Sequence, residues 1–182
     1  MCENMLGKIK IGVSSCLLGN EVRYDGGHKR DRYITDVLGT HVELVPVCPE
    51  TEVGFGVPRE TIRLEGEVDA PRLVTTRTRI DYTDRMLAWA SRRVLELEKE
   101  ALSGFVFKKS SPSCGMIRVK VFHGRGRPFI RGVGLFARTF MDHFPLLPVE
   151  EEGRLYDSVI REAFIERIFI LNGRPVPQCD GE

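Results

Sequence analysis

The chain has 182 residues, a formal net charge of +1, 42% hydrophobic residues and 29% charged residues. This composition is typical of a globular protein, and the near-neutral charge gives no indication of a nucleic-acid partner or a membrane surface. No apolar run reaches the roughly 18 residues that would indicate a transmembrane helix. The first residues lack the basic and apolar regions of a signal peptide, so we predict a cytoplasmic protein with residues 1–182 in a single domain.

The chain begins with a strand–helix–strand pattern. A buried strand is predicted over residues 9–14, a short helix over 31–38 and a second strand over 42–47. Units of this kind build parallel sheets, because the helix carries the chain back to the start of the next strand.

The pattern changes between residues 61 and 75. Two short strand-like runs, 61–64 and 72–75, flank a turn-rich segment, which predicts a small antiparallel flap. Several arginines in and beside this flap are interpreted as a solvated, charged face: Arg59, Arg63, Arg72, Arg77 and Arg79.

The second half of the chain completes the predicted fold. A long helix begins at Asp81 and ends before Gly104, because apolar residues between them recur at helical spacing. We then predict a third parallel strand (105–107), an edge strand (118–122), a helix (133–143), a fourth core strand (146–149) and a strongly amphipathic helix (about 152–171). The sequence therefore predicts an α/β fold, a three-layer α/β/α Rossmann-like domain with a mostly parallel sheet, a small antiparallel flap and a core over about residues 9–148.

Three cysteines, Cys16, Cys48 and Cys114, stand where strand-like runs end. Because the carboxyl ends of parallel strands meet at one edge of a sheet, we expect these thiols to converge. Three thiolates are one fewer than the four ligands of a closed structural zinc or iron–sulfur site, so one position would stay open for chemistry. Cys2 and Cys179 are interpreted as incidental, although Cys179 as a fourth ligand is left open.

Polar and charged residues flank these cysteines. Glu50 follows Cys48 by two residues and could transfer protons near a group at the open position. Lys108 and the serines before Cys114 offer hydrogen bonds and positive charge to a cluster. From the residues alone, a buried structural role for each cysteine and a zinc or redox-sensing module both stay open.

Five motifs occur in a fixed order along the chain: VSSCLLG (13–19), VRYDG (22–26), PVCPE (46–50), GVPRE (56–60) and FKKSSPSCG (107–115). With them the chain resembles the thiouracil desulfurase (TudS) family over about residues 9–148. The resemblance implies an oxygen-sensitive 4Fe-4S cluster held by Cys16, Cys48 and Cys114, with the fourth iron unligated by protein.

The resemblance also implies a reaction. The sulfur of a thiolated pyrimidine, such as 2- or 4-thiouracil or its nucleotide, would bind the open iron, and water would replace it to give uracil and sulfide. Glu50 and Ser111 are the implied catalytic residues, and the candidate substrate-binding residues are Ser14, Ser15, Arg23, Asp25, Lys108 and Ser113. A sulfur transferase with the same site is the alternative enzyme. A tRNA substrate is possible but not indicated by charge, and the oligomeric state is left open.

Overall fold

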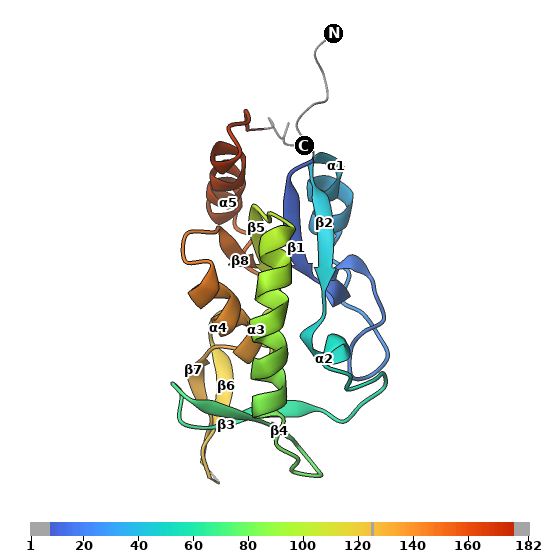
Figure 1. Ribbon diagram of the computed structural model, residues 1–182, viewed down its shortest axis with the longest axis vertical. Coiled ribbons are helices and arrows are strands. Elements are labelled where there is room, and N and C mark those ends of the chain that lie inside the picture. The colour runs from blue at the N-terminus through green and yellow to red at the C-terminus, as the bar shows by residue number, and fades with distance from the viewer. Residues whose placement is uncertain (1–7, 125, 177–182) are drawn as a thin grey trace.

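A parallel sheet forms the centre of the molecule in the computed structural model, which describes residues 8–124 and 126–176 (Figure 1). Its strand order is β2 (Glu43–Val47), β1 (Lys10–Ser14), β5 (Gly104–Phe107) and β8 (Val149–Glu151), and all three pairings are parallel. Pro46 lies on the edge strand β2, where the missing N–H group is tolerated. The predicted fourth core strand at 146–149 is present but shifted: β8 begins only at Val149, and Leu146 is 83% exposed.

Helices cover both faces of this sheet, as the sequence predicts. One face packs against α3 (Thr83–Lys99) and α4 (Leu135–His143), and the other against η2 (Tyr33–Leu38) and α5 (Ser158–Leu171). Phe105 and Phe107 on β5 stack with ring centroids 4.3 Å apart and contact the aromatic rings of α4. The backbone of β1 must approach Phe105 closely, because a Cβ atom at Gly12 would lie 2.3 Å from its ring.

The helix boundaries follow local chemistry. The predicted helix at 31–38 is present as η2, which continues as α1 (Gly39–His41). The long helix α3 begins two residues after Asp81, whose carboxylate accepts a hydrogen bond from the Thr83 N–H at 2.9 Å. Two short elements that the sequence analysis did not predict, η1 (Ser15–Leu18) and α2 (Pro49–Glu52), follow the ends of β1 and β2.

The last helix differs from its prediction in both length and character. It begins at Ser158, after Asp157 caps the N–H groups of Val159 and Ile160. Phe164 and Ile168 are buried, but Val159 and Ile170 are 73% and 62% exposed. Apolar side chains therefore lie around the whole helix, and the prediction of strong amphipathicity is wrong.

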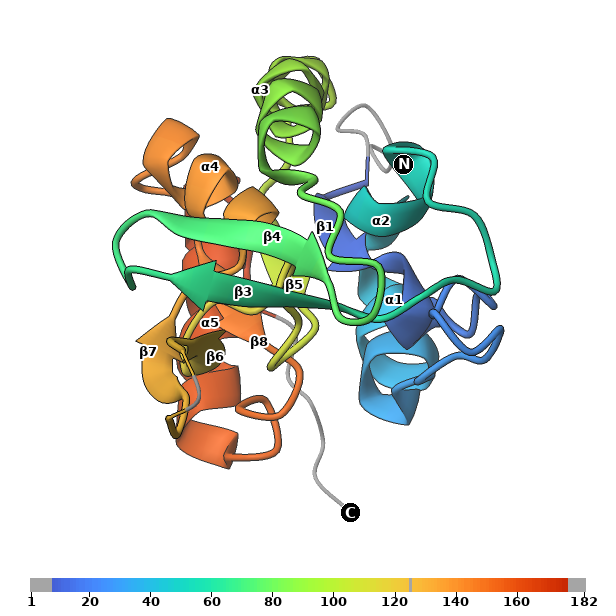
Figure 2. The same cartoon turned by 90° about the horizontal axis from the view of Figure 1, so that it is seen from below.

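A second sheet lies at one end of the molecule (Figure 2). Its order is β4 (Pro71–Thr75), β3 (Ile62–Gly66), β6 (Val119–Phe122) and β7 (Phe129–Gly132), with β3 and β6 parallel and the outer pairs antiparallel. The predicted flap is thus half of a larger sheet, and β6 is an inner strand rather than the predicted edge strand. The strand β7 was missed, because its three exposed residues give no buried pattern.

Arg72, Arg77 and Arg79 are exposed, as the solvated face predicts, and several arginines near this sheet also form ion pairs. Arg63 and Arg79 both pair with the buried carboxylate of Glu65, and Arg72 lies 3.7 Å from Asp81. The hydrogen bond from Arg79 lowers the pKa of Glu65 from 4.5 to about 2, with a further contribution from Arg63.

This ion pair predicts a pH dependence of stability. The folded-state pKa of Glu65 lies below its unfolded value, so its stabilisation is complete above pH 4.5 and is lost as the pH falls towards about 2. Urea unfolding should show that wild type loses more stability than Glu65→Gln over this pH interval. Parallel curves for the two proteins would contradict the assignment.

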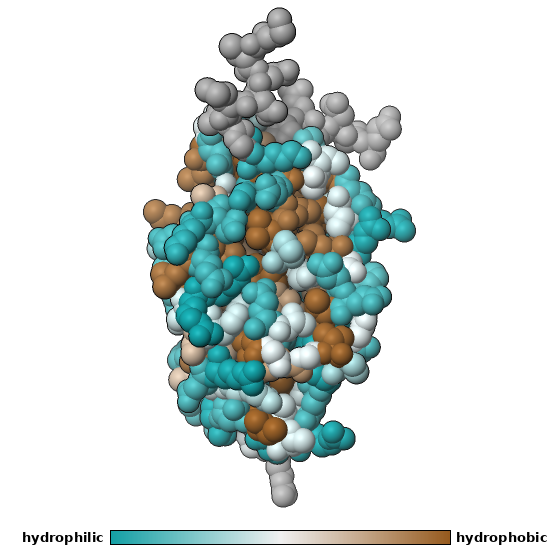
Figure 3. Space-filling model, turned by 45° about the vertical axis from the view of Figure 1, so that its right-hand side comes forward, coloured by the Kyte–Doolittle hydropathy of each residue, from teal (hydrophilic) through white to brown (hydrophobic). Residues whose placement is uncertain are grey.

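The surface gives one further observation. Figure 3 shows a face on which polar and charged residues surround smaller hydrophobic areas. Within residues 8–124 and 126–176, no helix is long and apolar enough to cross a membrane.

Candidate functional site

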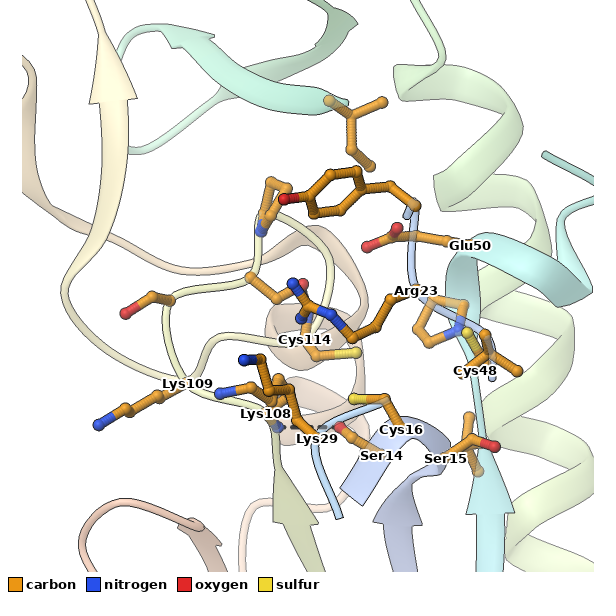
Figure 4. A pocket seen from close by; sticks show the side chains of 18 of the residues that line it. Ser14, Ser15, Cys16, Arg23, Lys29, Cys48, Glu50, Lys108, Lys109 and Cys114 are labelled. Atoms are coloured by element: carbon orange, nitrogen blue, oxygen red, sulfur yellow. Dashed lines mark hydrogen bonds between the residues drawn. The ribbon is translucent and has the colours of Figure 1, made fainter. Parts of the chain in front are cut away.

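The carboxyl ends of β1, β2 and β5 open onto a cavity of about 400 Å³. Cys16 lies in η1 after β1, Cys48 directly follows β2, and Cys114 lies in the loop after β5. All three cysteines are free and line this cavity, and Figure 4 shows Cys16 and Cys114 with their sulfur atoms directed towards its interior. The structure therefore brings together three thiols that are far apart in sequence.

These cysteines are thiols rather than thiolates in the absence of a metal. Burial raises the pKa of Cys16 to about 11, although the positive charge of Lys108 acts in the opposite direction. Burial also raises the pKa of Cys48, and it raises that of Cys114 further with the help of the nearby Glu50. Metal ligation requires thiolates, so binding a metal centre here would release protons.

The spacing of the thiols bears on which metal centre they fit. Among the described residues, no group of three or more His, Cys, Asp or Glu side chains is arranged to hold a metal ion. One tetrahedral zinc ion needs all its sulfur ligands within about 2.3 Å of one point. In an iron–sulfur cluster each thiolate binds a different iron, so its ligands stand further apart. Thiolates are the ligand type that such a cluster takes, and Cys16, Cys48 and Cys114 line one cavity.

Glu50 lies in the first turn of α2, with its side chain 16% exposed at the cavity wall. Its Oε1 atom accepts a hydrogen bond of 2.8 Å from the Ser113 hydroxyl. Its Oε2 atom accepts two from Arg59, at 3.0 and 2.5 Å. Arg59 is 6% exposed and also donates to the carbonyl of Val22 at 2.8 Å. The interpretation of Arg59 as a solvated charge is therefore wrong: it fixes the Glu50 carboxylate.

Ser111 and Ser113 connect Glu50 to the Cys114 loop. The Ser111 hydroxyl oxygen accepts hydrogen bonds from the backbone N–H groups of Ser113 and Cys114 at 3.2 and 3.1 Å. It lies 3.0 Å from the Ser113 hydroxyl, which donates to Glu50. Ser111 lines the cavity, whereas Ser113 is fully buried behind it.

The remaining candidate substrate-binding residues divide into two groups. Ser14, Ser15, Arg23 and Lys108 line the cavity, and Asp25 does not. The Ser14 hydroxyl accepts a hydrogen bond from the Lys108 N–H at 2.9 Å, and that of Ser15 accepts one from the side chain of Asn20. The exposed Asp25 carboxylate lies 3.5 Å from Arg23, a side chain that does line the cavity.

An acid directly after β8 and another on α2 support the cysteine segments, and the sequence analysis missed them. Glu152 pairs with the Lys108 ammonium group and accepts a hydrogen bond from the Lys109 N–H at 2.7 Å. Glu52 accepts one from the Cys48 N–H at 2.9 Å. The run Glu150–Glu152 was the available signal, because three acids after an apolar segment are unusual unless they have buried partners.

Cys2 and Cys179 lie outside the described residues.

The N-terminus of α4 holds the Cys114 loop. The N–H groups of Gly134, Leu135 and Ala137 donate to the carbonyls of Gly115, Pro112 and Ser113 at 2.8, 3.2 and 3.1 Å. The helix and loop backbones approach so closely that a Cβ atom at Gly134 would lie 2.6 Å from the Ser113 carbonyl. Only glycine fits this contact without a backbone shift.

Gly134→Ala is therefore expected to destabilise the fold by about 1–3 kcal/mol, since the loop must move to admit the methyl group. The free energy of unfolding in urea measures this effect. Gly126→Ala is a suitable control, because its added Cβ would have no neighbour closer than 3.6 Å. Equal stability of the two variants would contradict the close packing.

Three comparisons place the chain among known proteins. The model of the 2-thiouracil desulfurase family matches residues 11–152, which include the three cysteines and Glu50. The uncharacterized protein YbbK of Bacillus subtilis (strain 168) is 31% identical over 108 residues, covering 57% of this chain and 71% of the relative. A solved structure described as a [4Fe-4S]-dependent thiouracil desulfidase, TudS, aligns with a TM-score of 0.70 and 28% identity, over 87% of this chain and 100% of that chain. The chain belongs to the 2-thiouracil desulfurase family.

Proposed function

We propose that this protein is a [4Fe-4S]-dependent desulfurase that replaces the sulfur of a thiolated pyrimidine with oxygen and releases sulfide. The observation that carries the proposal is the convergence of three free thiols on one cavity whose wall also holds the fixed Glu50 carboxylate. Family membership and the similarity to a [4Fe-4S]-dependent thiouracil desulfidase support it.

Cys16, Cys48 and Cys114 would hold the cluster, which leaves one iron without a protein ligand. When bound, the cluster supplies a Lewis-acidic iron that polarises the thiocarbonyl group and takes up the departing sulfide. The protein must then direct a water molecule to the ring carbon and remove a proton from it.

Glu50 is positioned for that proton transfer. Arg59 occupies its Oε2 atom with two hydrogen bonds. Among the described residues, Oε1 accepts only the Ser113 hydroxyl, so it keeps a lone pair for water. The hydroxyl oxygen of Ser111 already accepts two backbone N–H groups, so its own proton is available to donate to the substrate or to Ser113. Glu50 therefore acts as the general base and Ser111 as a donor that orients the substrate.

The charge of the cavity favours a substrate with an anionic group. Five cations line it: Arg23, Lys29, Arg59, Lys108 and Lys109. Glu152 pairs with Lys108, and Glu50 pairs with Arg59, but no acid among the described residues pairs with Lys29 or Lys109. A nucleoside monophosphate carries the complementary charge, so we propose the thiolated nucleotide as a better substrate than the free base.

A comparison of kcat/KM for 4-thiouridine 5′-monophosphate and 4-thiouracil tests this preference. Lys29→Ala should lower kcat/KM for the nucleotide by about 10–100-fold, the range expected for a hydrogen bond to a charged group. The same variant should lower kcat/KM for the free base by a smaller factor. Lys120→Ala, which removes an exposed lysine on β6, is the matched control and should leave both values unchanged. Equal losses for both substrates in Lys29→Ala would contradict a phosphate contact.

The direction of sulfur movement separates the desulfurase from its rivals. Anaerobically reconstituted protein should convert 2- or 4-thiouracil to uracil with one sulfide released per turnover. A sulfur transferase would instead take up sulfide into uridine, and a zinc or redox-sensing module would do neither. Either of the latter results would overturn the proposal.

A further inference from the structure

Glu151 is a buried carboxyl group without a charged partner. Its residue is 5% exposed, and no Lys, Arg or His among the described residues forms an ion pair with it. Its Oε1 atom instead accepts hydrogen bonds from the backbone N–H groups of Met116 and Ile117, at 2.8 and 3.3 Å.

The neighbours of Glu151 show how unusual this arrangement is. Glu150 and Glu152 are buried to a similar degree, but Glu150 pairs with Arg154 at 2.7 Å and Glu152 pairs with Lys108. Burying a carboxylate away from a counter-ion is unfavourable, and here burial raises the pKa of Glu151. The fold keeps this unfavourable group at a position where its only hydrogen-bond donors from elsewhere in the described chain are two backbone amides.

Those two amides belong to the segment that follows Cys114. Met116 and Ile117 lie two and three residues after the cysteine, while α4 holds the carbonyls of residues 112, 113 and 115 from the other side. Donors and acceptors of the same loop are thus bound to different elements, β8 and α4. The two elements therefore satisfy different backbone groups of the loop: Glu151 on β8 binds N–H groups, and α4 binds carbonyls.

We propose that Glu151 is a positioning residue that keeps the Cys114 thiol at the cavity before and after metal binding. The chain then holds a preformed ligand segment, rather than one ordered by the metal centre. This proposal depends on the proposed function in one respect: it takes Cys114 to be a ligand of the metal centre.

Two measurements test this role. The first is the rate at which iron leaves the reconstituted protein in the presence of a chelator. The second is the rate of alkylation of Cys114 relative to Cys16 in the cluster-free protein, followed by mass spectrometry. Glu151→Ala should lose iron about 10–100-fold faster than wild type, the range seen when groups supporting a metal ligand are removed, and its Cys114 should be alkylated faster.

The conservative variant distinguishes positioning from charge. Glu151→Gln keeps an acceptor oxygen for the Met116 and Ile117 amides, so it should remain close to wild type in both measurements. Glu150→Ala removes an equally buried acid from the same strand and should leave both rates unchanged. If Glu151→Ala does not fold, Glu151→Asp replaces it, because a side chain shorter by one methylene reaches the two amides poorly.

Three results would overturn the proposal: wild-type rates in Glu151→Ala, a Glu151→Gln variant as impaired as the alanine variant, or an equal effect of Glu150→Ala. A different result is expected if the proposed function, rather than the role of Glu151, is wrong. A wild-type protein that never binds iron would refute the cluster, while the alkylation rates of the cluster-free protein would still decide the role of Glu151.

Discussion

Replacing any one of Cys16, Cys48 and Cys114 with alanine is expected to abolish cluster binding and lower desulfurase activity by at least about 100-fold. The three thiols line one cavity from three different strand ends, so no neighbouring cysteine of the described chain can replace a missing ligand. Iron and acid-labile sulfide content after anaerobic reconstitution, with the rate of sulfide release, measures both effects.

The chain offers its own control for these variants. Cys2 and Cys179 are the remaining cysteines of the sequence, and the variant with both replaced by alanine should keep wild-type iron content and rate. Loss of iron in that variant, or full activity in any of the three cavity variants, would contradict the assigned ligand set.

Glu50→Gln is expected to lower kcat by about 10²–10⁴-fold while leaving the iron content unchanged, the range typical of a lost general base. Glutamine keeps the size of the side chain and its hydrogen-bond acceptor for Ser113, but it cannot take a proton from water. Steady-state rates with 4-thiouracil, taken alongside iron analysis of the same sample, test the effect.

Glu60→Gln is the matched control for Glu50→Gln. Glu60 is also an acid next to Arg59, but its carboxylate accepts hydrogen bonds from the Thr78 N–H and hydroxyl, outside the cavity. The Glu60→Gln variant should retain the wild-type rate. A Glu50→Gln variant that is iron-loaded and fully active would remove Glu50 from the proton-transfer step.

The sequence predicted the elements whose patterns are local. The strands β1 and β5 are largely apolar runs, and a cysteine among turn residues follows each of them, so this edge of the sheet could be predicted from the sequence. The long helix was likewise predicted, because its apolar residues recur at helical spacing. The fold class and the convergence of the thiols both depend on these elements.

The parts that were missed depend on partners distant in sequence. The strand β8 was placed three residues early, because its buried residues are Glu150 and Glu151 rather than apolar side chains, and Glu150 pairs with Arg154. Arg59 looked like a surface charge until the fold brought Glu50 and the Val22 carbonyl to it. The second sheet needed the parallel pairing of β3 with β6, which joins segments more than 50 residues apart.

Desulfuration is expected to depend on a cluster held by these three cysteines. The most direct test is graded anaerobic reconstitution, with iron per chain, acid-labile sulfide and the rate of sulfide release from a thiolated pyrimidine measured on each sample. No sulfide should be released without iron, and the rate should rise to its maximum near about four irons and four sulfides per chain. A rate independent of iron content, or a fully loaded protein that releases no sulfide from thiouracil or its nucleotide, would contradict this expectation.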